Sequence, residues 1–310
     1  MTEAQAASRD HGPSLLTPGV LVPFIIVTVI WGSTWLVIRD QVSAVPASWS
    51  VAYRFLLASV AMAILARARG LSLWIGGRGV AFAACLGASQ FMLNFNFVYR
   101  AEMVLTSGVV AVFYALLLIP NSLLAWLTFR QPVSRNFIIG SVIAVTGVVL
   151  LFLREYRYAD VAPGAVLEGI ALCFCGLMAA SVSNVMQGTP IARRLPIISV
   201  LAWAMLLGGL MDAALAWTVA GPPVFDTRPS YMAGIAYLAV AGSVVTFPLY
   251  FRLIQQIGAG RAAYTGVLTP VIAMLLSTLF EGYRWSTLAV VGALLSVAGM
   301  VIAMRAKPSR

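Results

Sequence analysis

A long apolar segment occurs twice in this chain, about 150 residues apart, and such a duplication restricts the folds that a chain can adopt. The first copy runs from Tyr99 to Phe129 and the second from Phe251 to Phe280. Each copy holds a tyrosine followed at the same spacing by a proline: Tyr114 and Pro120 in the first, Tyr264 and Pro270 in the second. We therefore expect two homologous halves.

The repeat sets the domain boundaries. We expect a first repeat over residues 18–158 and a second over residues 159–304, between a polar tail at 1–17 and a short tail at 305–310. Glycines downstream of each segment also match, which predicts close helix packing at these positions. The matching pairs are Gly140 with Gly292 and Gly147 with Gly299.

The composition shows where these halves fold. Hydrophobic residues make up 61% of the chain and charged residues only 10%, against about a quarter charged in ordinary soluble domains. Runs of about 20 apolar residues cross a bilayer as helices, so we predict an all-α membrane protein of ten transmembrane helices. The predicted spans are 20–38, 48–66, 79–98, 106–129, 136–153, 166–186, 197–218, 230–251, 261–280 and 285–304.

The number and charge of the spans predict the topology. Five spans per half is an odd number, so the second half would enter the membrane inverted, as in secondary transporters with a central site. Roughly twice as many Lys and Arg residues fall on the side of the termini, which predicts that both termini are cytoplasmic. Residues 1–17 lack a charged-then-apolar leader, so no cleaved signal peptide is expected.

Two motifs resemble those of a known family. The first span carries WGSTW at 31–35 and the second YRFLLASVAM at 53–62; with the duplicated ten-span layout they resemble the EamA-type drug/metabolite transporter superfamily. The resemblance implies a bacterial inner-membrane exporter of amino acids or metabolites, most similar to aromatic amino-acid exporters. One departure is that Glu281 follows the second long span, whereas Arg130 and Gln131 follow the first.

Polar residues inside the third span indicate a cavity, because such groups are costly in a bilayer. Gln90, Asn94 and Phe97 fall on one face of a helix, and their amides could bind a zwitterion. Thr246 occupies the matching position in the eighth span. The alternative is that these residues only form hydrogen bonds between helices.

The first span presents Trp31, Thr34 and Trp35 on one face. Two indoles one turn apart could stack on an aromatic substrate, although ordinary packing is equally compatible with the pattern. Asn184 lies in the sixth span, which has no such aromatic pair. A cavity lined by both spans would suit a solute with one apolar and one polar end.

The two tyrosine and proline pairs are also candidates for the pathway. We expect Tyr114 in the outer half of the membrane and Tyr264 in the inner half, at opposite ends of one pathway; the alternative is interfacial anchoring. Pro120 removes a backbone hydrogen bond and should leave the carbonyl of Leu116 free, and Pro270 should act likewise. Such prolines are expected to bend the helices.

Arg54 is the one positive charge well inside a predicted span. Glu102 and Asp212 are both placed toward the outer side, so we predict a structural ion pair with one of them. The alternative is that Arg54 binds a substrate carboxylate bidentately.

Other chemistries are disfavoured. The net charge of +10 comes without a contiguous basic run, so a nucleic-acid partner is not expected. No nucleotide-binding loop, catalytic triad or metal-ligand cluster is present in the sequence, so we expect neither a cofactor nor an enzyme.

We expect as partners an amino-acid substrate and the lipid bilayer, and we leave the oligomeric state open, with a monomer among the options. No carboxylate stands near the middle of a span, so coupling through such a group is not expected; a small-multidrug or other metabolite exporter is the alternative.

Overall fold

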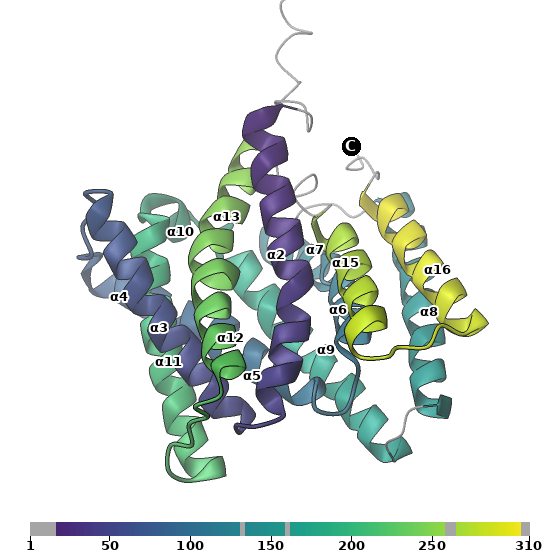
Figure 1. The fold of residues 1–310 in the computed structure, drawn as a ribbon. Helices are drawn as coiled ribbons and strands as arrows, with labels where there is room; N and C mark the ends of the chain where they lie inside the picture. Colours follow the sequence, from purple (N-terminus) through teal and green to yellow (C-terminus); the bar gives the residue numbers. More distant parts are fainter. Residues whose placement is uncertain (1–16, 131–133, 159–161, 258–264, 305–310) are drawn as a thin grey trace, which may run out of the picture.

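The computed structural model describes residues 17–130, 134–158, 162–257 and 265–304, and all regular structure in these ranges is helical (Figure 1). Eight helices or helical runs are long and apolar enough to cross a membrane, and two shorter apolar helices, Thr265–Phe280 and Thr287–Ala303, follow them. Long apolar runs form helices because a helix pairs its backbone groups internally.

The helices fall into two series of similar order. The first series is α2 (Pro18–Val42), α3 (Ala47–Ala68), α4 (Gly76–Leu86), η1 (Gly87–Asn94), α5 (Phe95–Ala101), α6 (Ser107–Ala115), α7 (Leu118–Phe129) and α8 (Arg135–Tyr158). The second series is α9 (Pro163–Met186), α10 (Pro190–Arg194), α11 (Ile197–Ala220), α12 (Pro229–Ala239), η2 (Val240–Val245), α13 (Thr246–Ile257), α15 (Thr265–Phe280) and α16 (Thr287–Met304).

The helix positions agree with the predicted spans to within a few residues at most ends. The third predicted span is the run α4–η1–α5, and the eighth is α12–η2–α13. Both contain a π-helical segment, η1 and η2, at corresponding places. Segments of this kind are rare and are frequent at functional sites.

The helices are packed as two outer pairs around a central group. In Figure 1, α3 packs along α11 at one side of the bundle and α8 along α16 at the other. Between them, α2 contacts both α13 and α15, and α9 contacts η1, α5 and α7. The start of α2 and the end of α16 lie at the same end of the bundle (Figure 1).

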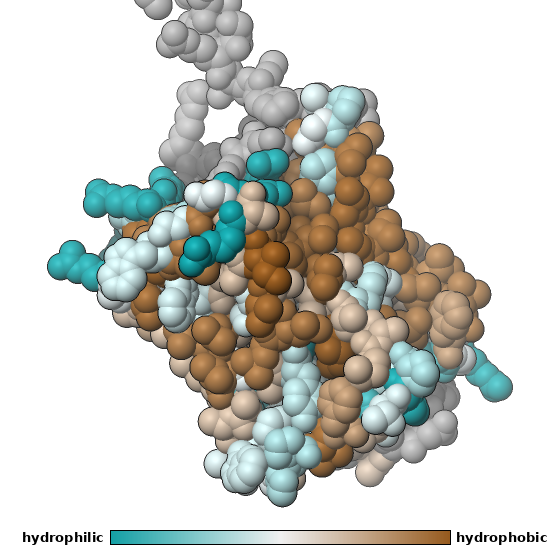
Figure 2. Space-filling model, turned by 60° about the vertical axis from the view of Figure 1, so that its left-hand side comes forward, coloured by the Kyte–Doolittle hydropathy of each residue, from teal (hydrophilic) through white to brown (hydrophobic). Residues whose placement is uncertain are grey.

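The outer surface is apolar. Many Leu and Val side chains on the helices are more than half exposed, among them Val60, Val142, Leu279 and Leu294. Figure 2 shows hydrophobic residues spread over the middle of one face, with hydrophilic residues toward its edges. An apolar surface of this extent is normally covered by another molecule, and for helices of this length the bilayer provides that cover.

The pairing of α8 with α16 depends on glycine, as the sequence predicts. A Cβ atom on Gly147 would lie 2.4 Å from the backbone nitrogen of Ser296, and one on Gly299 would lie 2.3 Å from that of Ala144. The two backbones are therefore in direct contact, which is how small residues permit close helix packing in membranes. This pair lies at one side of the bundle (Figure 1).

Replacing Gly147 should destabilise the bundle. Gly147→Leu forces α8 away from α16, and overpacking of this kind costs about 1–3 kcal/mol or more. We expect a lower midpoint of thermal unfolding for the purified protein in detergent. Gly164→Leu is the matched control, because a Cβ at Gly164 meets no atom within 4 Å. Equal midpoints for the two variants would contradict this account.

Candidate functional site

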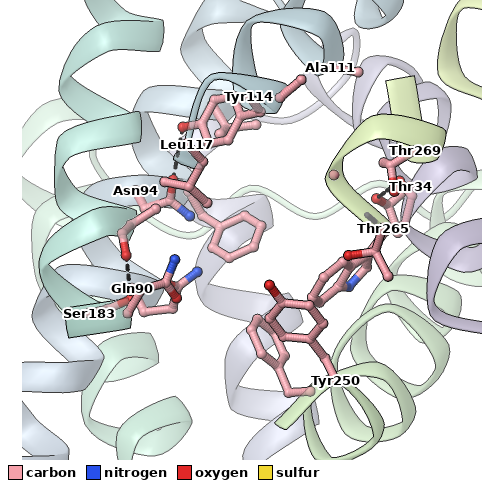
Figure 3. A pocket seen from close by; sticks show the side chains of 18 of the residues that line it. Thr34, Gln90, Asn94, Ala111, Tyr114, Leu117, Ser183, Tyr250, Thr265 and Thr269 are labelled. Atoms are coloured by element: carbon pink, nitrogen blue, oxygen red, sulfur yellow. Dashed lines mark hydrogen bonds between the residues drawn. The ribbon is translucent and has the colours of Figure 1, made fainter. Parts of the chain in front are cut away.

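A cavity lies between the two series of helices, bounded by side chains of α2, α3, η1, α6, α7, α9, α13 and α15 (Figure 3). Its volume is about 200 Å³, whereas a single water requires only about 10–15 Å³ of such space. The cavity can therefore hold a small organic molecule. The polar and aromatic residues that line it are Trp31, Thr34, Trp35, Arg54, Gln90, Phe91, Asn94, Phe95, Tyr114, Asn121, Ser183, Asn184, Gln187, Phe247, Tyr250, Thr265 and Thr269.

One wall of the cavity carries amide side chains (Figure 3). The hydroxyl of Tyr114 donates a hydrogen bond of 2.8 Å to Oδ1 of Asn94, and Ser183 donates to Oε1 of Gln90. Because a carbonyl oxygen has two lone pairs and an amide nitrogen two hydrogens, Asn94 and Gln90 keep capacity to bind a ligand. The predicted residues Gln90, Asn94 and Tyr114 are thus brought together.

Aromatic rings form a second part of the lining. Trp31 packs against Tyr250 with ring centroids 4.9 Å apart and against Phe247 at 5.7 Å. Trp35 packs against Tyr114 at 5.3 Å. These rings fix one another and leave a rigid apolar surface next to the amide wall. Both tryptophans predicted from the first span therefore line the cavity.

Three buried polar atoms in the lining have no hydrogen-bond partner. They are Nε1 of Trp35, Nε2 of Gln187 and Oγ1 of Thr269. Unsatisfied buried polar groups are costly and need an explanation.

Two predicted site residues lie outside this lining. Phe97 lies on α5, where its Cβ would be 3.2 Å from a Cβ placed on Gly176 of α9. On α5 it is Phe95 and Val98 that line the cavity, and Val98 lies one helical turn after Asn94. Thr246 is fully buried; it accepts a 2.9 Å hydrogen bond from Nε1 of Trp31 and donates to the carbonyl of Gly242. It positions Trp31.

The predictions for the two prolines and for the second tyrosine compare differently with the structure. The carbonyl of Leu116 is not free, because it accepts a hydrogen bond of 2.9 Å from the backbone N–H of Ile119. The chain breaks between α6 and α7 just before Pro120, and this tighter turn takes up the bond that proline cannot make. Pro270 lies inside α15 and lines the cavity. Tyr264 lies outside the described residues.

The predicted ion pair is not formed. No carboxylate of the described residues lies within 4.0 Å of the Arg54 guanidinium. Asp212 instead accepts a 2.5 Å hydrogen bond from Nδ2 of Asn96, and the carboxylate oxygens of Glu102 are buried without a hydrogen-bond partner. The sequence places all three groups toward one side of the membrane, but a shared depth does not bring their side chains together.

A cluster of hydrogen-bonded polar groups lies where α2, α5 and α15 end and α6 begins. Arg39 donates a hydrogen bond to the carbonyl of Glu102, and Ser107 and Ser277 both donate to Oε2 of Glu281, Ser107 at 2.7 Å. Glu102, Ser107 and Ser277 are fully buried. Toward the other end, lining residues on α7 and α9 are partly exposed. We name the cluster formed by Arg39, Glu102, Ser107, Ser277 and Glu281 the polar seal.

Sequence reasoning missed several lining residues. Ser183, Thr265 and Thr269 line the cavity but were not singled out. Thr265 and Thr269 are one helical turn apart and so share a face, a pattern that the nearby tyrosine and proline overshadowed. Asn184 lines the cavity, and its Nδ2 donates to Oδ1 of Asn121 at 3.4 Å.

A bundle of apolar helices around a polar and aromatic cavity defines a multi-pass membrane protein with room for a small molecule between its helices. The model of the EamA-like transporter family matches residues 18–153 and again residues 167–305. The chain therefore belongs to the EamA-like transporter family and is a membrane transporter. The double match follows the two halves of the chain.

Curated relatives are similar over most of their length. PagO of Salmonella typhimurium is 26% identical over 273 residues, covering 86% of this chain and 87% of PagO. PecM of Dickeya dadantii is 25% identical, covering 70% of this chain and 71% of PecM. YedA of Escherichia coli K12, described as an uncharacterized inner membrane transporter, is 26% identical, covering 81% of this chain and 79% of YedA.

A solved crystal structure shares the fold. It covers 91% of this chain and 95% of its own, with a TM-score of 0.68 at 18% sequence identity.

Proposed function

We propose that this transporter is a secondary carrier of the bacterial inner membrane that exports amino acids, aromatic ones above all, and similar small metabolites. The observation that carries the proposal is the chemistry of the cavity, where amides and hydroxyls face aromatic rings and no described lining residue is acidic. Such a lining suits a zwitterion with a flat apolar side chain.

We further propose that the carrier works by alternating access between two inverted five-helix repeats, with both termini cytoplasmic. The order of helices in the two series, the matching π segments η1 and η2, and the cavity between the halves support this arrangement. The start of α2 and the end of α16 lie at one end of the bundle (Figure 1), as an even number of spans requires.

A small-multidrug carrier is the second candidate. Carriers of lipophilic cations usually need a buried acidic residue, because a cation in the membrane requires a counter-charge. Arg54 lines the cavity and no described lining residue is Asp or Glu, which favours uncharged or zwitterionic solutes over cations.

Uptake by liposomes containing the purified protein tests the proposal. We expect saturable uptake of labelled phenylalanine and tryptophan, little uptake of threonine or of a lipophilic cation, and no requirement for a pH gradient. Liposomes without protein are the control. Cation uptake that depends on the gradient, with no amino-acid uptake, would move the function to the multidrug class.

A further inference from the structure

Arg54 is a cation in the wall of the cavity. It lies on α3 and is only 2% exposed, yet it contributes to the cavity lining. Its guanidinium carbon lies 4.5 Å from the ring centroid of Phe95 and 5.0 Å from that of Phe55. Two aromatic rings therefore fix the guanidinium beside the space that a ligand would occupy.

The hydrogen bonds of this guanidinium are few and long. Nε and one terminal nitrogen donate to the hydroxyl of Ser243, and the other terminal nitrogen donates to that of Tyr99, all at 3.4 Å. A guanidinium has five N–H groups, and a good N–H to oxygen bond is about 2.9–3.0 Å. Arg54 therefore retains capacity for a stronger acceptor.

Arg54 also lacks a nearby counter-charge. Within the described residues no carboxylate lies within 4.0 Å of it, and its aromatic and hydroxyl partners are all uncharged. A buried charge is retained in proteins when it is paired, and ionisable groups inside a membrane commonly mark a substrate path. An anion that enters the cavity would supply the counter-charge that Arg54 lacks.

We propose that Arg54 binds the carboxylate of the transported molecule. The planar guanidinium matches a carboxylate with two parallel hydrogen bonds. Asn94 and Gln90 can then accept from the ammonium group, while Trp31 and Trp35 contact the apolar end. The substrate class is thus an amphipathic molecule with a carboxylate, and this assignment rests on the proposed function for its amino-acid form.

Competition for phenylalanine uptake into liposomes tests the assignment. The competitors are phenylpropionate, which keeps the carboxylate, and phenethylamine, which keeps only the amine. We expect phenylpropionate to compete at least tenfold better with the native protein. Arg54→Gln should raise KM for phenylalanine at least tenfold and abolish this preference, whereas Arg54→Lys should keep part of it. Arg193→Gln, exposed on α10 and away from the cavity, should behave like the native protein.

If the two compounds compete equally well for phenylalanine uptake by the native protein, the assignment is overturned, and no variant is needed to show it. An unchanged preference in a folded Arg54→Gln protein would do the same. If the native protein takes up no amino acid, the proposed function fails, and quenching of tryptophan fluorescence then tests the assignment. Phenylpropionate should quench at lower concentration than phenethylamine, and the reverse order, or no quenching by either, would refute carboxylate binding.

Discussion

Joining α6 to α15 by a disulfide should stop transport, and reducing that disulfide should restore it. An ideal Cβ at Gly108 would lie 3.1 Å from Cβ of Ser277, close to the distance of about 3.5–4.5 Å in disulfides. The only close obstacle below 3.0 Å is the flexible sulfur of Met274, at 2.5 Å. The variant Gly108→Cys/Ser277→Cys can therefore form the bond after a small adjustment.

The reason for the expected loss is the position of this pair beside the polar seal. Ser277 itself donates to Glu281, and Gly108 follows Ser107, which donates to the same oxygen. Alternating access requires the closed end to open, which separates α6 from α15 there. A covalent link prevents this step, so we expect oxidised protein to lose uptake by roughly tenfold or more.

The measurement is liposome uptake before and after treatment with a reductant. The exposed Cys85 and Cys175 are first replaced by serine, and each single cysteine variant serves as a control that cannot form the link. Full activity of the crosslinked protein would show that the polar seal does not open during transport.

The positions of the helices could be predicted because a bilayer core leaves the backbone few alternatives. The lining by Trp31, Thr34 and Trp35 also followed from the sequence, since α2 is a continuous helix whose faces repeat regularly. The same reasoning singled out Phe97, whereas the lining residues on α5 are Phe95 and Val98. Which of two neighbouring residues reaches the cavity depends on the rotation of the helix, which helical periodicity alone does not determine to within one residue.

The polar contacts could be predicted less well than the helices. Glu102 and Asp212 were sensible partners for Arg54 by depth in the membrane, but an ion pair requires two side chains within about 4 Å. That distance depends on how the helices are rotated and packed against one another, which span positions do not determine. The polar seal likewise joins Ser107 to Glu281, residues far apart in the chain.

Replacing Asn94 with leucine should raise KM for phenylalanine by roughly tenfold or more, because losing a hydrogen bond to a charged group costs about 1.5–3 kcal/mol. Leucine is similar in size but neither donates nor accepts a hydrogen bond. Tyr114→Phe should have a smaller effect, since it removes only the donor to Oδ1 of Asn94 and leaves the amide in the cavity. Uptake kinetics in liposomes measure both.

A purely structural role for Asn94 predicts a different result, and a charged substitution at this position distinguishes the two roles. Asn94→Asp would add an acidic group to a lining that otherwise contains none among its described residues. If Asn94 faces the ammonium group of the substrate, this variant should strengthen competition by phenethylamine while Asn94→Leu weakens it. Asn136→Leu, exposed on α8, is the matched control. Loss of thermal stability in both variants, with unchanged competition in the folded protein, would assign Asn94 to packing.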